Sequence, residues 1–230
     1  MFQFIYKGRF DCLITKEVFE SHVERTYNEM KHQLDVKWYP AKIIITMEMD
    51  PKRPRGWGGT TEYDSKKEIV FRLHLQLFGY SKKEQTFDIM NQLFDYVLRH
   101  ELFHFFIPSI ENNSCWSEGV TDFMTIFHKK GSTEGNLLEY LVHLKQLYKE
   151  IDEEYKQHKY GYLSGYKKML SLYQEDASVV DDMYKLIQDR HKNNDTYKKK
   201  YSPSDIIAYN PKFKTFFLGR CNKHFVHKLK

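Results

Sequence analysis

One short stretch, His100-Glu101-Leu102-Phe103-His104, decides how the rest of this chain is interpreted. On a helix, residues four apart lie one above the other on the same face, so both imidazoles can reach a single metal ion. Many metallopeptidases hold zinc with this H-E-x-x-H pattern, and its glutamate lies beside the bound water. We therefore expect His100 and His104 to be metal ligands and Glu101 to be the general base.

The residues ahead of the motif have helical periodicity. Apolar positions recur every three to four residues and lead directly into it: Phe87, Met90, Leu93, Phe94, Val97 and Leu98. Pro108 cannot continue a helix, so the predicted helix closes there.

A second helix is expected in the segment 116 to 124, WSEGVTDFM, with Ser117 as its cap. Glu118 falls in its first turn, where a carboxylate can complete a His₂Glu zinc site and leave the fourth position open, as in catalytic sites. Asp122 lies four residues on, on the same face. It suits an acceptor for the outer N–H of a ligand histidine.

Around these residues the chain resembles the gluzincin peptidases, and within them the aminopeptidase N and glycyl aminopeptidase-like families. In those families a segment of W-x-x-E-G-x-x-x-Y/F type follows the H-E-x-x-H helix. Trp116, Glu118, Gly119 and Thr121 resemble it here, with one residue rather than two between Trp116 and Glu118. The resemblance implies one zinc ion per chain, bound by His100, His104 and Glu118. It also implies that Glu101 shuttles the proton while a peptide or protein substrate is hydrolysed. The linker, residues 105 to 117, is shorter than those families usually have.

Other interpretations of the motif can be tested by position. A metzincin would need Gly at position 107 and His at position 110, but both are Ile, so that class is excluded. Asp122 could itself be the third ligand, as in an aspzincin-like scheme. The alternative without a metal is an amphipathic helix with two satisfied histidines, followed by a helix with ordinary capping acids.

A substrate-binding element is expected before the metal helix. In the aminopeptidase relatives, a glycine-rich edge strand carries a Glu that binds the free amino group of the substrate, and Gly58, Gly59 and Glu62 match this element in part. The alternative is a simple Gly-Gly turn before a strand. If Glu62 faces the zinc, exopeptidase action follows; otherwise endopeptidase action is the better expectation.

The relatives also place a tyrosine just before a helix to stabilise the oxyanion. Here Tyr209 precedes Asn210-Pro211, which reads as the start of a helix that runs to about residue 228. The alternatives are Tyr160, Tyr162 and Tyr166.

The composition agrees with a globular enzyme but does not identify one. The formal charge is +5 over 230 residues, and lysines gather at residues 198 to 200 and 212 to 230. A basic module that binds nucleic acid or an anionic surface, with a vestigial metal site, is therefore the second hypothesis. It ranks lower because no nucleic-acid motif accompanies the lysines.

The chain has no apolar span of about 18 residues and no secretory signal. Its three widely spaced cysteines suggest no disulfide framework, which favours the cytoplasm. The sequence does not determine the oligomeric state or the substrate side chains that the enzyme would prefer.

The order of segments predicts an α+β fold with a zincin-like core. We expect a helix over residues 16 to 34, strands over 41 to 49 and 69 to 77, an irregular loop over 51 to 59, and then the metal helix. Apolar stripes predict further helices over 137 to 151 and 179 to 191. The catalytic core would span residues 1–130, and a mainly helical subdomain that completes the cleft would span residues 131–230.

Overall fold

The computed structural model of the chain describes residues 1–8, 15–50, 56–64, 69–78, 87–110, 113–129, 153–192 and 199–218. The chain folds into two compact units. Unit 1 comprises Met1–Phe105 with Val142–Glu150, and unit 2 comprises Phe106–Leu141 with Ile151–Lys230. The expected domain boundary after residue 130 stays a prediction, because residues 130 to 152 lie outside the described part. The same holds for the apolar stripe over residues 137 to 151.

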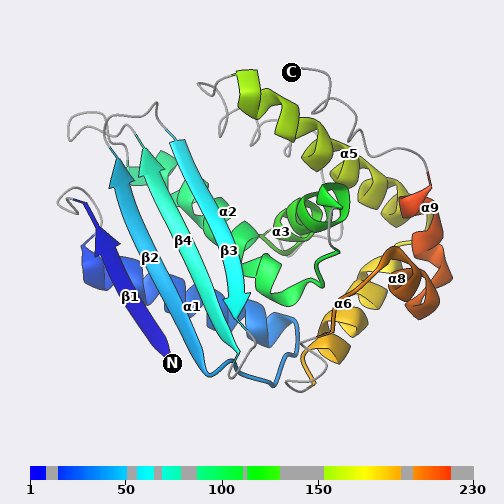
Figure 1. Cartoon of the computed structure of the whole chain (residues 1–230), viewed down its shortest axis with the longest axis horizontal. Helices are drawn as coiled ribbons and strands as arrows, with labels where there is room; N and C mark the ends of the chain where they lie inside the picture. The colour runs from blue at the N-terminus through cyan, green and yellow to red at the C-terminus, as the bar shows by residue number, and fades with distance from the viewer. Residues whose placement is uncertain are drawn as a thin grey trace. The chain divides into compact units, whose positions relative to one another are not determined.

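Unit 1 is built on a four-stranded mixed sheet, as Figure 1 shows, so the chain has the expected α+β character. The strands lie in the order β1-β2-β4-β3, where β1 is Phe2–Lys7, β2 is Lys42–Asp50, β4 is Val70–Phe78 and β3 is Gly56–Asp64. Strand β2 is parallel to both β1 and β4, whereas β3 is antiparallel to β4.

The strands expected over 41 to 49 and 69 to 77 are confirmed as β2 and β4. The loop expected over 51 to 59 is wrong from Gly56 onward, because β3 begins there and pairs with β4 along its length. Strand β1 was not anticipated. It alternates half-buried Phe2, Phe4 and Tyr6 with exposed residues, which is the period-two pattern of an edge strand with one covered face.

Helix α1, Lys16–Gln33, confirms the helix expected over 16 to 34. Thr15 caps its start by accepting a hydrogen bond from the backbone N–H of Val18. Its apolar residues recur every three to four positions and are buried throughout: Phe19, Val23, Tyr27, Met30 and Leu34. The helix ends before Asp35, which has a positive φ of 50°.

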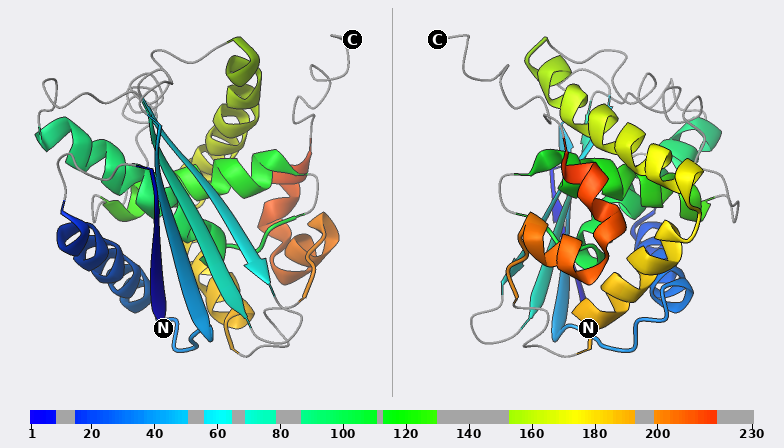
Figure 2. Two further views of the ribbon diagram at one scale, coloured as in Figure 1. Left: turned by 60° about the vertical axis from the view of Figure 1, so that its left-hand side comes forward. Right: turned by 90° about the vertical axis from the view of Figure 1, so that its right-hand side faces the viewer.

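One face of the sheet is covered by helices. The aligned positions Phe2, Ile43 and Phe71 share that face through the parallel register. Tyr27 of α1 packs edge-on against Phe2, and Phe105 of helix α2, Phe87–Phe106, stacks on Phe71 at 4.2 Å between ring centroids. Both helices therefore lie on the same face, and Figure 2 (left) shows α1 beside the sheet seen nearly edge-on.

Unit 2 is helical in its described part. A π-helix, η1 (Cys115–Val120), continues into α3 (Thr121–Lys129), followed by α5 (Glu153–Glu175) and α6 (Val179–Arg190). After these come α8 (Pro203–Tyr209), the 3₁₀ turn η2 (Pro211–Phe213) and α9 (Lys214–Phe217). Helix α6 confirms the helix expected over 179 to 191.

Three expectations for unit 2 need correction. Ser117 is not a cap, because the helix has already begun at Cys115 and the side chain of Asn113 accepts the hydrogen bond from the N–H of Trp116. The helix after Asn210 begins at Pro211 as expected, but it ends at Phe217 rather than near residue 228, since Leu218 is extended.

The expectation of no disulfide is also wrong. Cys115 is disulfide-bonded, and its partner lies outside the described residues. The sequence had suggested no disulfide, so this premise for a reducing compartment is removed. Among the described residues, no helix combines the length and apolar character that a membrane crossing requires.

Candidate metal centre

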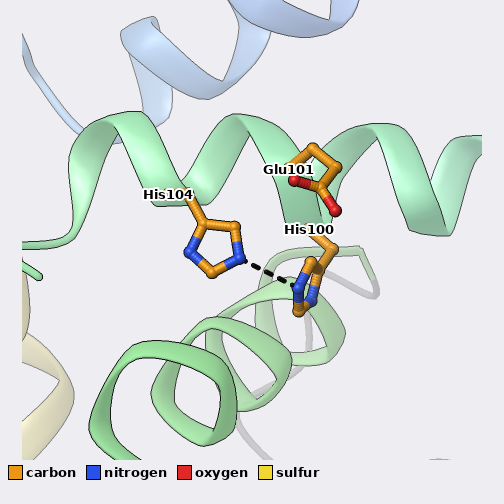
Figure 3. Close-up of side chains that lie close together, drawn as sticks. All are labelled: His100, Glu101 and His104. Carbon is orange, nitrogen blue, oxygen red and sulfur yellow. Dashed lines mark hydrogen bonds between the residues drawn. The ribbon is translucent and has the colours of Figure 1, made fainter. Parts of the chain in front are cut away.

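Helix α2 presents three potential metal-binding side chains together. Figure 3 shows His100, Glu101 and His104 projecting from two successive turns. Their ligand atoms all lie within 4.8 Å of one another, and the Nε2 atoms of the two histidines are 3.1 Å apart. His100 and Glu101 are largely buried, at 7% and 6% exposure, while His104 is half-buried. The structure brings the three side chains together, and their roles in metal binding and catalysis stay predictions.

The spacing fits a metal ion. Two imidazole nitrogens bound to one tetrahedral zinc at the usual bond length would be roughly 3.3 Å apart, close to the observed separation. At 3.1 Å, two Nε2 atoms either share a proton as N–H···N or direct both lone pairs at one cation. The His100, Glu101 and His104 group can therefore hold a metal ion.

Apolar packing of α2 sets the direction of these side chains. Leu98, Leu102 and Phe105 are fully buried and form one stripe of the helix, which Phe105 anchors to the sheet through Phe71. His100 lies two residues beyond Leu98, about 200° further around the helix, so the imidazoles emerge on the side away from this stripe.

Glu118 and Asp122 belong to unit 2, whereas the histidine pair belongs to unit 1. Glu118 is half-buried in η1, and Asp122 is buried in the first turn of α3. Short π-helical segments are rare and often occur at functional sites, which draws attention to Glu118 independently of its motif. The approach of both carboxylates to the histidines stays a prediction.

Trp116 and Gly119 hold η1 in place. The indole N–H of Trp116 donates to the carbonyl of Pro108 at 2.7 Å, and its ring packs against Phe213, Phe216 and Phe217. Gly119 lies directly against Gly165 of α5, where a side chain on either residue would collide with backbone. The W-x-E-G pattern thus combines two packing residues with the candidate ligand between them.

The proposed substrate-binding element lies on an edge strand. Gly58, Gly59 and Glu62 are all within β3, which is at the edge of the described sheet. In the register with β4, Glu62 is opposite Arg72. The alternative of a Gly-Gly turn is wrong, because the glycine pair is inside the strand. A role in binding an amino group stays a prediction.

Tyr209 is the last residue of α8, and its hydroxyl donates to Asp189 at 3.0 Å. Partial burial raises the pKa of Tyr209, and the hydrogen bond to Asp189 raises it further. Of the alternatives, Tyr166 is fully buried and Tyr162 half-buried, both within α5, and the side chain of Tyr160 lies outside the described part. The choice of tyrosine stays a prediction.

Two residues that contact the end of α2 were not singled out as site residues from the sequence. His191 is buried, and its Nε2 hydrogen bonds to the carbonyl of Phe106 at 3.1 Å. Arg190 was not noticed; it is buried and donates to the carbonyl of Ile107. Nothing local in the sequence reveals either contact.

No protein-family model matches this chain, and no curated protein and no solved structure does either. The likeness to gluzincin peptidases therefore rests on the quoted motif residues. The functional argument rests on the geometry of the metal centre.

Proposed function

We propose that this chain is a zinc-dependent peptidase of gluzincin type with a zincin-like core. The observation that carries the proposal is the convergence of His100, Glu101 and His104, with the two Nε2 atoms 3.1 Å apart. Imidazole nitrogen suits zinc, and a carboxylate that is close to the metal without being needed as a ligand suits a base. Structural zinc sites usually have four protein ligands that include cysteine, and the described residues offer no cysteine in this cluster.

Zinc in such a site would act as a Lewis acid and lower the pKa of a water molecule, so that the water ionises near neutral pH. Glu101 would take the proton from the attacking water and return it to the leaving amine. Its place beside the imidazoles, within 4.8 Å, supports this role. Its burial also supports it, because a carboxylate shielded from bulk water exchanges protons chiefly with bound substrate and bound water.

Glu118 would be the third protein ligand, and Asp122 would orient a ligand histidine. The π-helical position of Glu118 and the burial of Asp122 support these assignments. Tyr209 would donate to the oxyanion. Because its hydroxyl donates to Asp189, this role requires the hydroxyl to change partner when substrate binds.

Aminopeptidase-like action is the preferred form of the proposal. A glycine-containing edge strand leaves room for an extended peptide, and Glu62 would bind the ammonium group of its first residue. If Glu62 does not contribute, cleavage within chains becomes the expectation.

Ion pairs at two lysines of the basic stretches weaken the alternative of a module that binds nucleic acid or an anionic surface. Lys199 pairs with Asp205 at 3.0 Å, and Lys212 pairs with Asp176 at 2.6 Å and also with Asp182. Lysines already paired with carboxylates contribute little to phosphate binding.

The disulfide at Cys115 bears on the compartment. Structural disulfides persist mainly in oxidising surroundings, so it favours such a compartment over the cytoplasm that the cysteine spacing had suggested.

Elemental analysis and peptide hydrolysis test the proposal together. We expect about one zinc per chain and hydrolysis of unblocked peptides. Glu101→Gln should keep the zinc and lower kcat by roughly 10²-fold or more. Glu175→Gln, the same substitution at an exposed glutamate, is the matched control and should change neither. A zinc-free protein, or full activity in Glu101→Gln, would overturn the proposal. Blocked and free amino termini then separate endopeptidase from exopeptidase cleavage.

A further inference from the structure

Helix α2 ends at Phe106, and the carbonyls at and just after this end lack the usual helix cap. The residues after the helix are Ile107 and Pro108, with no glycine to form a left-handed cap. Phe106, Ile107 and Pro108 are all buried, so water cannot serve their carbonyls freely. Each of these three carbonyls needs a donor from elsewhere in the chain.

Three side chains from outside the helix supply those donors, and we call them the carbonyl clamp. His191 Nε2 bonds to the carbonyl of Phe106 at 3.1 Å, the Arg190 guanidinium to that of Ile107, and the Trp116 indole to that of Pro108 at 2.7 Å. Arg190 and His191 are 1% and 3% exposed and stand together at the end of α6. The imidazole of His191 also packs on the ring of Phe106, with centroids 5.6 Å apart.

The burial of Arg190 indicates a specific role. Arginine is almost never fully buried unless its charge is compensated, and here the partner is the carbonyl end of a helix, which carries partial negative charge. A guanidinium or an ammonium group can donate to the carbonyl of Ile107, whereas an apolar side chain of similar length cannot.

His104 is in the last turn of α2, two residues before Phe106. Last turns fray, whereas His100 lies one turn further inside the helix. The 3.1 Å separation of the two Nε2 atoms therefore depends on whether the helix end stays closed.

We infer that Arg190 and His191 are positioning residues for the metal centre: by closing the end of α2, they hold His104 in register with His100. This inference rests on the proposed function, because it assigns the clamp to a metal ligand. Neither residue belongs to the His100, Glu101 and His104 group that could hold the metal.

The test combines two measurements on the full chain. Zinc affinity is measured by competition with a chelator, and backbone amide exchange is measured along α2. In Arg190→Met we expect zinc affinity to fall about tenfold or more, as when a group supporting a metal ligand is removed. Exchange should quicken at Phe103 to Phe106 but stay unchanged at Tyr96 to Leu98. Arg190→Lys, which keeps a charged donor, should restore most of the affinity.

Met183→Ala is the matched control. Met183 is fully buried in the same helix α6 but offers no N–H donor, so its loss destabilises α6 without removing a hydrogen bond. We expect this variant to unfold at a lower temperature and to bind zinc as the unaltered chain does. Should Arg190→Met fold too poorly to measure, His191→Phe removes one donor and keeps the ring packed on Phe106.

The outcomes separate this inference from the proposed function. Equal zinc affinity in Arg190→Met and Met183→Ala at equal stability, or unchanged exchange in the last turn, overturns the positioning role alone. An unaltered chain that holds no zinc overturns the proposed function, and the assignment of the clamp to a metal ligand with it.

Discussion

Replacing Gly119 by alanine should destabilise the protein, because η1 and α5 touch there through backbone alone. A Cβ built on Gly119 falls within 2.6 Å of three backbone atoms, which belong to Gly165 and Tyr166. Ordinary contacts between carbon atoms are about 3.5–4.0 Å, so the two segments would have to separate by roughly 1 Å.

The magnitude follows from two opposing effects. Inserting a methyl group into a packed interior costs about 1–3 kcal/mol, and the upper end applies because helix backbone cannot rotate aside as a side chain can. Alanine is favoured over glycine in a helix by about 1 kcal/mol, which offsets part of the cost. The net loss in the free energy of unfolding should be about 2 kcal/mol, or a midpoint lower by roughly 4–8 °C.

Thermal and urea unfolding followed by circular dichroism would measure this loss. Ser164→Ala, beside Gly165 on the same helix, is the control and should stay within about 0.5 kcal/mol of the parent, as substitutions away from tight contacts do. A double variant with alanine at both Gly119 and Gly165 should cost less than the sum of the single variants, since either methyl already separates the segments. A midpoint for Gly119→Ala equal to or above that of the parent would refute the close approach.

Two further predictions concern unit 2. Ser202 and Asp205 form a capping box at the start of α8, and hydrogen bonds from Ser202 and an ion pair with Lys199 lower the pKa of Asp205 to about 2. The stabilisation that this carboxylate gives is present above about pH 4 and is lost as the pH falls toward 2. The stability difference between the parent and Ser202→Ala should therefore shrink over that interval, and an NMR titration should show the pKa of Asp205 raised in the variant; an unchanged pKa would remove Ser202 from the cap. The chain has three cysteines, so a disulfide that joins Cys115 to another cysteine of the same chain would leave one to react with an alkylating reagent. Alkylation of the unfolded protein should thus add one label without reductant and three with it, whereas three labels in both conditions would exclude the disulfide.

The candidate metal centre shows how much of a site can be predicted from the spacing of nearby residues. His100 and His104 are one helical turn apart, so the convergence of their imidazoles follows from helix geometry once the periodicity of α2 is recognised. The same holds for α1, α6 and the alternating strands β2 and β4, whose patterns repeat within a few residues. The local pattern of β3 was misread, because its glycines resemble a turn and only pairing with β4 makes them a strand.

By itself, the amino-acid sequence determined the helices with strong apolar periodicity, the two central strands and the three neighbouring side chains that could hold a metal ion, because each depends on interactions between residues close in the chain. Only the tertiary structure revealed the contact of Gly119 with Gly165, the disulfide state of Cys115 and the bond from Arg190 to Ile107, which joins residues 83 apart in the chain. Such contacts depend on where distant segments meet. From the sequence alone, a buried arginine cannot be distinguished from an exposed charged residue at the end of a helix. The side chains that could bind a metal are thus set locally, whereas the end of their helix is held by residues that folding brings from far along the chain.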